Sequence, residues 1–290
     1  MADYDQRQRF FFPDSDIRGE MVRLQGSYAQ ALGARNDPML VQGLLGEALA
    51  AVTLLTGTLK FEGRLSLQAQ GDGPITLLLA ECTHDSQVRA MARYADELGN
   101  DAAPLPALLG DGMMAITIRP EKGNQYQGLV PLEGDSLASC LEDYFSQSEQ
   151  LPSRLWLAAG NGHAAGLLLQ RLPDRIADRE HNAAAWDHAV ALANTLTLEE
   201  MLDLPMTTML HRLYHEQPPE LAAPTPVAFG CTCSRQKVQN TLLSLGAGEL
   251  RNVLDELGEA RVSCDFCGRE EVFDAVDLAA LVHELTQGQA

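Results

Sequence analysis

Four of the chain's six cysteines stand in the final segment, residues 231–290, as two close pairs. Cys231 and Cys233 are separated by one residue, and Cys264 and Cys267 by two. Thiolates are favoured zinc ligands, and four of them complete a tetrahedral shell. A segment shorter than roughly 70–80 residues seldom folds on a hydrophobic core alone. The pattern therefore predicts a small C-terminal domain folded around one zinc ion, with these four cysteines as its ligands.

Three roles are open to these thiols. Metal binding stabilises zinc-finger peptides by about 10–16 kcal/mol, as much as the whole stability of a typical domain, about 5–15 kcal/mol, so the metal could be a permanent structural element. Zinc-bound thiolates also remain oxidisable, and oxidation would expel the metal and unfold the segment. In the third role, Cys264 and Cys267 would serve a thiol–disulfide enzyme. Such a pair usually opens a helix beside a βαβ unit, whereas this pair is expected between short strands.

The first part of the chain has the periodicity of paired strands. Alternating or apolar runs separated by glycine-containing turns predict three hairpins, at residues 64–81, 113–132 and 154–172. Helical spacing of apolar residues covers 38–59 and 136–148. Hairpins with interspersed helices indicate an α+β fold with a largely antiparallel sheet. We place this core domain at residues 1–177.

Residues 178–230 have a different character. The first part of this region has no strand pattern, and its apolar residues recur at helical spacing. The proline-rich stretch "QPPELAAPTPVAFG" follows, and we interpret it as a linker. Pro205 interrupts the helical pattern. A stripe of methionine and leucine is either ordinary core or an adaptable surface that binds other proteins. Its members are Leu198, Met201, Leu202, Met206, Met209, Leu210 and Leu213.

Charge and composition exclude several classes of function. The net charge of −19 and the pI near 4.6 argue against nucleic-acid binding. The N-terminus lacks the apolar stretch of a signal peptide. The most apolar region, residues 43–59, is interrupted by Glu47 and followed by Lys60, and is judged too short to span a bilayer. We therefore expect a cytoplasmic protein without membrane association, in which clustered cysteines bind metal or act in redox chemistry.

The remaining candidate motifs do not indicate a catalytic or metal-binding site. His211 and His215 share a helix face, but Arg212 stands where a zinc protease needs glutamate. Cys82 and His84 are close in sequence, but no third candidate metal ligand accompanies them. Cys140 lies in an apolar helical stretch typical of a buried thiol. Phosphate-loop, dinucleotide and nucleophile-elbow motifs are absent from the sequence. We expect no catalytic residues and no enzyme activity.

Several long stretches, in order, resemble the redox-regulated heat-shock chaperones, the 33-kDa heat-shock protein family of bacteria. They are "IRGEMVRL", "LLTGTLKFEGRLSLQAQGDGP", "NQYQGLVPLEGDSLASCLEDYFSQSEQLPSRLWL", "AAGLLLQ", "LHRLYHE" and "FGCTCSR" with the later "CDFCG". The resemblance runs nearly from end to end. It is therefore more specific than the cysteine pattern alone.

The resemblance implies a mechanism. The reduced, zinc-bound form would be a monomer with little chaperone activity. Hypochlorous acid, or peroxide with heat, would form disulfides Cys231–Cys233 and Cys264–Cys267 and release zinc. The region 178–230 would then unfold as a metastable linker. The protein would dimerise and hold unfolding client proteins without ATP.

Two features depart from the family pattern. Gln236 stands where an acidic residue is expected after Ser-Arg. The expected linker is rich in alanine, the best helix former. Metastability of the linker therefore has to come from weak packing rather than from poor helix propensity.

Overall fold

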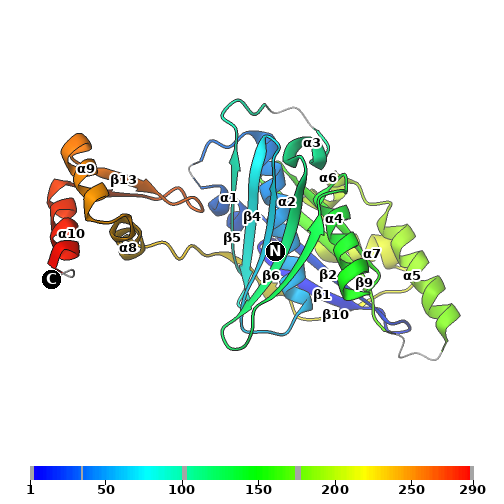
Figure 1. The fold of residues 1–290 in the computed structure, drawn as a ribbon. Helices are drawn as coiled ribbons and strands as arrows, with labels where there is room; N and C mark the ends of the chain where they lie inside the picture. The colour runs from blue at the N-terminus through cyan, green and yellow to red at the C-terminus, as the bar shows by residue number, and fades with distance from the viewer. Residues whose placement is uncertain (1–2, 34, 100–102, 174–177, 288–290) are drawn as a thin grey trace. The chain divides into compact units, whose positions relative to one another are not determined.

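The computed structural model describes the chain except residues 1–2, 34, 100–102, 174–177 and 288–290. Its contacts divide into two compact units (Figure 1). The first unit comprises Met1–Leu32 and Asn36–Gly230, and the second comprises Gly33–Arg35 and Cys231–Ala290. The predicted boundary after residue 177 adjoins a stretch outside the described residues.

One six-stranded sheet of the first unit, sheet A, is antiparallel and has the order β10-β1-β2-β9-β8, with β11 also paired to β1. Its strands are β1 (Gln6–Phe11), β2 (Ile17–Leu24), β8 (Ser153–Gly160), β9 (His163–Arg171), β10 (Glu220–Leu221) and β11 (Thr225–Pro226). The predicted hairpin at 154–172 is confirmed as β8–β9, in which Leu155 pairs with Leu168. The sheet thus combines the start of the chain with residues more than 200 positions later.

The second six-stranded sheet, sheet B, has the order β12-β5-β4-β3-β6-β7. Its strands are β3 (Gly63–Gly71), β4 (Ile75–Thr83), β5 (Gln87–Tyr94), β6 (Gly112–Pro120), β7 (Tyr126–Pro131) and β12 (Ala228–Phe229). The other two predicted hairpins are confirmed as β3–β4 and β6–β7. The pairing of β12 with β5 is parallel, which the sequence did not indicate.

Helix α2 (Met39–Thr58) contacts both sheets and forms the centre of the main hydrophobic core. It has 20 residues and, by length and composition alone, could cross a bilayer, so our judgement that this region is too short was wrong. Most of its apolar window is buried inside the protein, which is the behaviour of a core helix. Glu47 is tolerated within it because burial favours the neutral carboxyl group and raises the pKa of this side chain to about 7.

The remaining helices of the core are short. They are α1 (Gly26–Leu32), α3 (Leu105–Leu109), α4 (Leu137–Tyr144) and a π-helical turn, η1 (Phe145–Glu149). The Ser136 hydroxyl caps α4 by accepting a hydrogen bond from the backbone N–H of Ser139 at 3.2 Å. The helix predicted at 136–148 is therefore present, but its second half is wound as a π-helix.

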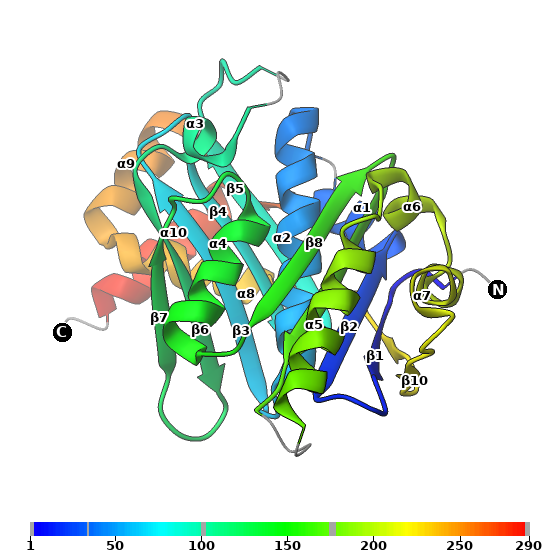
Figure 2. The same cartoon turned by 90° about the vertical axis from the view of Figure 1, so that its right-hand side faces the viewer.

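Three further helices, α5 (Arg179–Ala193), α6 (Leu198–Asp203) and α7 (Met206–Tyr214), cover the face of sheet A opposite α2 (Figure 2). Leu168 of β9 faces α2, whereas its neighbours Leu167 and Leu169 face the three helices, as the alternation of a strand requires. The predicted interruption at Pro205 is confirmed, because α6 ends at Asp203 and α7 begins at Met206. The described part of the region 178–230 belongs to the first unit.

The proline-rich stretch after α7, which we interpret as a linker, is paired with both sheets of the first unit in this structure. Its residues form β10, β11 and β12, which extend both sheets of the first unit. Gly230 then donates a backbone hydrogen bond to Val88 of β5 at 3.0 Å. Each of these strands has only two residues, so few backbone hydrogen bonds hold the stretch.

The second unit contains α8 (Arg235–Leu245), α9 (Ala247–Leu257), the hairpin β13 (Ala260–Ser263) with β14 (Glu270–Phe273), and α10 (Ala275–Gln287). Two helices, α8 and α9, lie between the cysteine pairs in the sequence, and α10 follows the second pair. Its core is small, with five buried hydrophobic residues among those described: Leu242, Leu250, Phe273, Leu278 and Leu281. A core of this size gives a unit of about sixty residues little stability of its own.

Candidate metal centre

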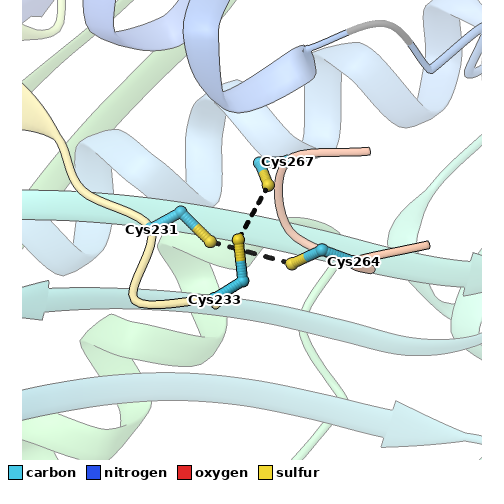
Figure 3. Close-up of side chains that lie close together, drawn as sticks. All are labelled: Cys231, Cys233, Cys264 and Cys267. Carbon is cyan, nitrogen blue, oxygen red and sulfur yellow. Dashed lines mark hydrogen bonds between the residues drawn. The ribbon is translucent and has the colours of Figure 1, made fainter. Parts of the chain in front are cut away.

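The four predicted cysteines of the second unit converge on one point (Figure 3). Their sulfur atoms all lie within 4.8 Å of one another. The Sγ atoms of Cys231 and Cys264 are 3.7 Å apart, and those of Cys233 and Cys267 are 3.5 Å apart. Four ligands placed 2.3 Å from a tetrahedral zinc ion lie about 3.8 Å from one another. The donor set and its spacing therefore fit a tetrahedral metal ion.

The hairpin β13–β14 positions the second pair. Ser263 and Glu270 are the last paired residues, so Cys264 and Cys267 lie in the connection between the strands. The Cys264 backbone N–H donates to the Arg269 carbonyl at 2.9 Å, and the Gly268 N–H donates to the Cys264 carbonyl at 2.8 Å. Gly268, directly after the second cysteine, has a φ of +69°, a conformation that glycine adopts without the cost of a Cβ. The turn presents both thiols on the same side (Figure 3).

The first pair lies immediately before α8. The Ser234 hydroxyl caps this helix by accepting a hydrogen bond from the backbone N–H of Lys237 at 3.3 Å. Cys233 therefore directly precedes a helix N-terminus. A helix N-terminus by itself favours a negatively charged sulfur, but at Cys233 burial and the neighbouring thiols outweigh this effect and raise the pKa.

Arg235 joins the two halves of the centre and was not recognised in the sequence. Its guanidinium donates to the Val272 carbonyl at 2.7 Å and to the Asp277 carboxylate at 2.5 Å, and it lies 4.1 Å from the centroid of the Phe273 ring. These contacts fix the start of α8 against β14 and α10. A single arginine two residues after Cys233 was the available signal, but its partners lie about 40 positions away in sequence.

The thiols strongly influence one another's ionisation. Burial and hydrogen bonding with Cys231 and Cys267 raise the pKa of Cys233, and burial also raises the pKa of Cys267. At Cys231 burial opposes ionisation, but hydrogen bonds from Cys233 and from the other thiols outweigh it and lower the pKa. Four neighbouring thiolates repel one another, so full deprotonation requires a bound cation. This is the chemistry of a metal-binding cluster.

The other sequence candidates form no second centre among the described residues. The rings of His211 and His215 have their centroids 6.4 Å apart, without a third ligand nearby in the described structure. Cys82 and Cys140 are buried in the main core. Burial raises the pKa of Cys82 to about 11, so this thiol is inert.

The methionine and leucine stripe lies in the first unit. Six of its members are buried against sheet A: Met201, Leu202, Met206, Met209, Leu210 and Leu213. Leu198 is the exception, with 65% of its surface exposed. The stripe is therefore core in this structure, and it belongs to the first unit, whereas the four cysteines belong to the second.

Comparison with known proteins identifies the family. The family model described as "Hsp33 protein" matches residues 5–274. The chain belongs to the Hsp33 family. A 33 kDa chaperonin of Pseudomonas aeruginosa is 49% identical over 284 residues, covering 97% of this chain and 95% of that protein. The 33 kDa chaperonin of Azotobacter vinelandii is also 49% identical, over 283 residues with the same coverage.

The Hsp33 fold is also found in a solved structure, that of the 33 kDa chaperonin (heat shock protein 33 homologue) of Thermotoga maritima. It superposes with a TM-score of 0.83 over 98% of this chain and 99% of the other, at 23% sequence identity. This likeness confirms the α+β fold with its antiparallel sheets and C-terminal cysteine cluster. Hsp33 proteins are chaperones and not enzymes, in agreement with the absence of catalytic motifs from the sequence.

Proposed function

We propose that this protein is a redox-regulated, ATP-independent holdase of the cytoplasm. In the reduced form one zinc ion would be bound by Cys231, Cys233, Cys264 and Cys267, and the protein would be a monomer with little activity. Oxidation would form disulfides Cys231–Cys233 and Cys264–Cys267, release zinc and unfold the linker at 178–230. The activated protein would dimerise and bind unfolding client proteins.

The arrangement of α5, α6 and α7 on sheet A carries this proposal. These helices cover an apolar sheet surface made of Phe10, Phe12, Ile17, Met21, Ala158, Ala165, Leu167 and Leu169. If the helices left the sheet, that surface and the buried stripe of α6 and α7 would be exposed together. Apolar surface of this kind binds unfolded chains, and it is an aggregation hazard when exposed permanently. A protein that exposes it only under stress avoids that hazard.

The packing of α5 explains how an alanine-rich linker can be metastable. Its three buried residues are Asn182, Ala189 and Ala193, which bring little apolar area into the core. A cavity of about 260 Å³ separates α5 and the end of α7 from the connection between β1 and β2. Unfilled space of this kind removes van der Waals contacts. Weak packing, rather than poor helix propensity, is therefore the source that we propose for a marginal stability of this region.

The path from the metal centre to these helices is short in sequence. Cys231 follows directly after Gly230, whose backbone N–H is bonded to β5, and the preceding strands β10–β12 have two residues each. Unfolding of the second unit would free one end of this stretch. The residues between α7 and the cysteines would then be held by the few hydrogen bonds that remain and by the packing of Val227 and Phe229 against the main core.

The oxidant accepts the electrons that the proposed disulfide formation releases. Each disulfide forms from two thiols with loss of two protons and two electrons, which hypochlorous acid or peroxide accepts. The shortest sulfur contacts, Cys231 to Cys264 and Cys233 to Cys267, run between the pairs rather than within them. The pairing Cys231–Cys233 and Cys264–Cys267 therefore rests on the family resemblance. Peptide mapping of the oxidised protein would test it.

The high negative charge suits the proposed active state. A net charge of −19 keeps a protein with exposed apolar surface soluble by mutual repulsion. The same charge repels nucleic acid.

The test is aggregation of a chemically unfolded client diluted into buffer, followed by light scattering. Reduced, zinc-loaded protein is compared with protein treated with hypochlorous acid, and zinc release is measured in the same samples. We expect scattering to be suppressed after oxidation only, together with zinc release and reversal by a reductant. Equal scattering in both samples with zinc retained would leave a permanent structural metal site. Turnover of a model disulfide would instead support a thiol–disulfide enzyme.

A further inference from the structure

Arg23 of β2 is an unusual residue for the interior of this protein. It is 2% exposed and is among the largest fully buried side chains of the chain. A buried guanidinium is costly unless it is paired and hydrogen-bonded. Its hydrogen-bond partners are the Asp3 carboxylate and the Leu202 carbonyl of α6.

The guanidinium of Arg23 connects three segments that are far apart in sequence. It donates to the Asp3 carboxylate at 2.5 Å and to the backbone carbonyl of Leu202 at 2.6 Å. Leu202 lies in the last turn of α6, where carbonyl groups lack intrahelical partners. The ring of Tyr4 lies over the guanidinium at 4.1 Å, and the His163 ring stacks on the other side of Tyr4 at 4.8 Å.

Asp3 also binds α7, on the other side of the junction between α6 and α7. Its second carboxylate oxygen accepts a hydrogen bond from the backbone N–H of Met206, the first residue of α7. The preceding Pro205 supplies no side-chain cap, so Asp3 satisfies this group from a distant part of the chain and places a negative charge at the helix N-terminus. One carboxylate therefore balances the buried Arg23 and caps α7.

The following residues of the N-terminal segment also contact the region 178–230. The backbone carbonyl of Asp5 accepts a hydrogen bond from Val227 at 2.8 Å. Strand β1 pairs with both β10 and β11. The start of the chain thus contacts the helical part and the proline-rich part of the proposed linker.

We infer that Asp3 is a positioning residue that holds α6 and α7 on sheet A and sets how readily they are released. Removal of its carboxylate leaves Arg23 buried with one fewer counter-charge and leaves the start of α7 uncapped. Both changes destabilise the attached state and spare the detached state, in which Arg23 is hydrated. Loss of the Asp3 carboxylate should also lower the amount of oxidant needed for activation. Only this consequence rests on the proposed function.

The test is hydrogen exchange of the full-length, reduced, zinc-loaded protein carrying Asp3→Ala. We expect the amides of α6 and α7 to exchange about tenfold faster or more, while those of α2 keep their protection. The matched control is Asp14→Ala, which removes an exposed carboxylate from the β1–β2 connection. Asp3→Glu retains the charge and should restore most of the protection.

The outcomes separate the inference from the proposed function. Exchange of α6 and α7 in Asp3→Ala at the rate of the wild type or of Asp14→Ala would overturn the inference. So would Asp3→Glu exchanging as fast as Asp3→Ala, because the charge would then not matter. If the oxidised wild type fails to hold clients, the proposed function fails while the exchange result stands. The dose of hypochlorous acid needed for half-activation should fall in Asp3→Ala and not in Asp14→Ala.

Discussion

Asn182 of α5 and Asp16, at the start of β2, hold each other by two hydrogen bonds. The Asn182 side-chain oxygen accepts from the Asp16 backbone N–H at 2.9 Å, and its amide donates to the Asp16 carboxylate at 2.8 Å. Asn182 is fully buried, whereas the hydrophobic residues of α5 that pack against the sheet are two buried alanines and the partly buried Ala185, Trp186, Val190 and Leu192. This polar contact is therefore a main attachment of α5 to the sheet.

Replacement of Asn182 by alanine should loosen α5. Loss of both hydrogen bonds, with a buried backbone N–H left unpaired, is expected to cost about 1–3 kcal/mol of local stability. Hydrogen exchange along α5 and the fluorescence of Trp186 measure the change. Asp187→Ala, an exposed substitution in the same helix, is the control. Unchanged exchange in Asn182→Ala would show that α5 is held by other contacts.

Tyr214 should contribute to the attachment of α7 to α5. Its buried hydroxyl donates to the Ala189 carbonyl at 3.1 Å, and burial raises the pKa of this phenol. Tyr214→Phe removes the hydrogen bond and keeps the ring contacts with Phe10 and Phe12. We expect a loss of about 1 kcal/mol, measured as faster exchange at the end of α7. Chaperone activation at lower oxidant doses should accompany it. A stability equal to the wild type would contradict the prediction.

Cys267→Ser should abolish tight metal binding, because a hydroxyl is a poor replacement for a thiolate. The small core around Leu250 then cannot hold the second unit, and its helices should unfold in the reduced protein. Zinc content by colorimetric titration and circular dichroism measure the two effects. Cys140→Ser is the control, because this thiol is buried in α4 of the first unit and is not one of the four clustered cysteines. Retention of one zinc per chain in Cys267→Ser would contradict the assignment.

Glu47 should make stability depend on pH. Burial raises its pKa from 4.5 to about 7 in the folded protein. Between these two pKa values the folded state holds a proton that the unfolded state has lost. The stabilisation linked to this proton is complete below pH 4.5 and is lost as the pH rises to about 7. Glu47→Gln should be more stable than the wild type by about 2 kcal/mol at pH 8, with a smaller difference at pH 5.

Denaturant unfolding at the two pH values measures the Glu47 effect. Glu62→Gln, at an exposed carboxyl group, should show no such pH-dependent difference from the wild type. A Glu47→Gln variant whose advantage is equal at pH 5 and pH 8 would contradict the assigned titration.

The sequence predicted features that depend on local periodicity. The three hairpins and the helices around Pro205 follow from alternation, helical spacing and turn residues, which act between near neighbours. The convergence of Cys231, Cys233, Cys264 and Cys267 was also predictable, because a shared metal is the usual reason for two close thiol pairs. These signals do not depend on knowing the tertiary structure.

Long-range pairing was not predictable. The two-residue strands β10, β11 and β12 are too short for a periodic signal, and β10 and β11 pair with β1 more than 200 residues away. Burial of Arg23 conflicts with the usual exposure of arginine, and only the position of Asp3 and α6 explains it. The position of Arg235 against Phe273 has the same cause. Each of these features depends on partners that the fold alone brings together.

The central claim is that oxidation of the metal centre releases α5, α6 and α7 from sheet A. Hydrogen exchange of the same protein sample before and after treatment with hypochlorous acid, with zinc release recorded in parallel, tests it most directly. The account predicts that residues 178–214 lose their protection as zinc leaves, while α2 and strands β3 to β7 of sheet B keep theirs. Protection of α6 and α7 that persists after complete zinc release would contradict it.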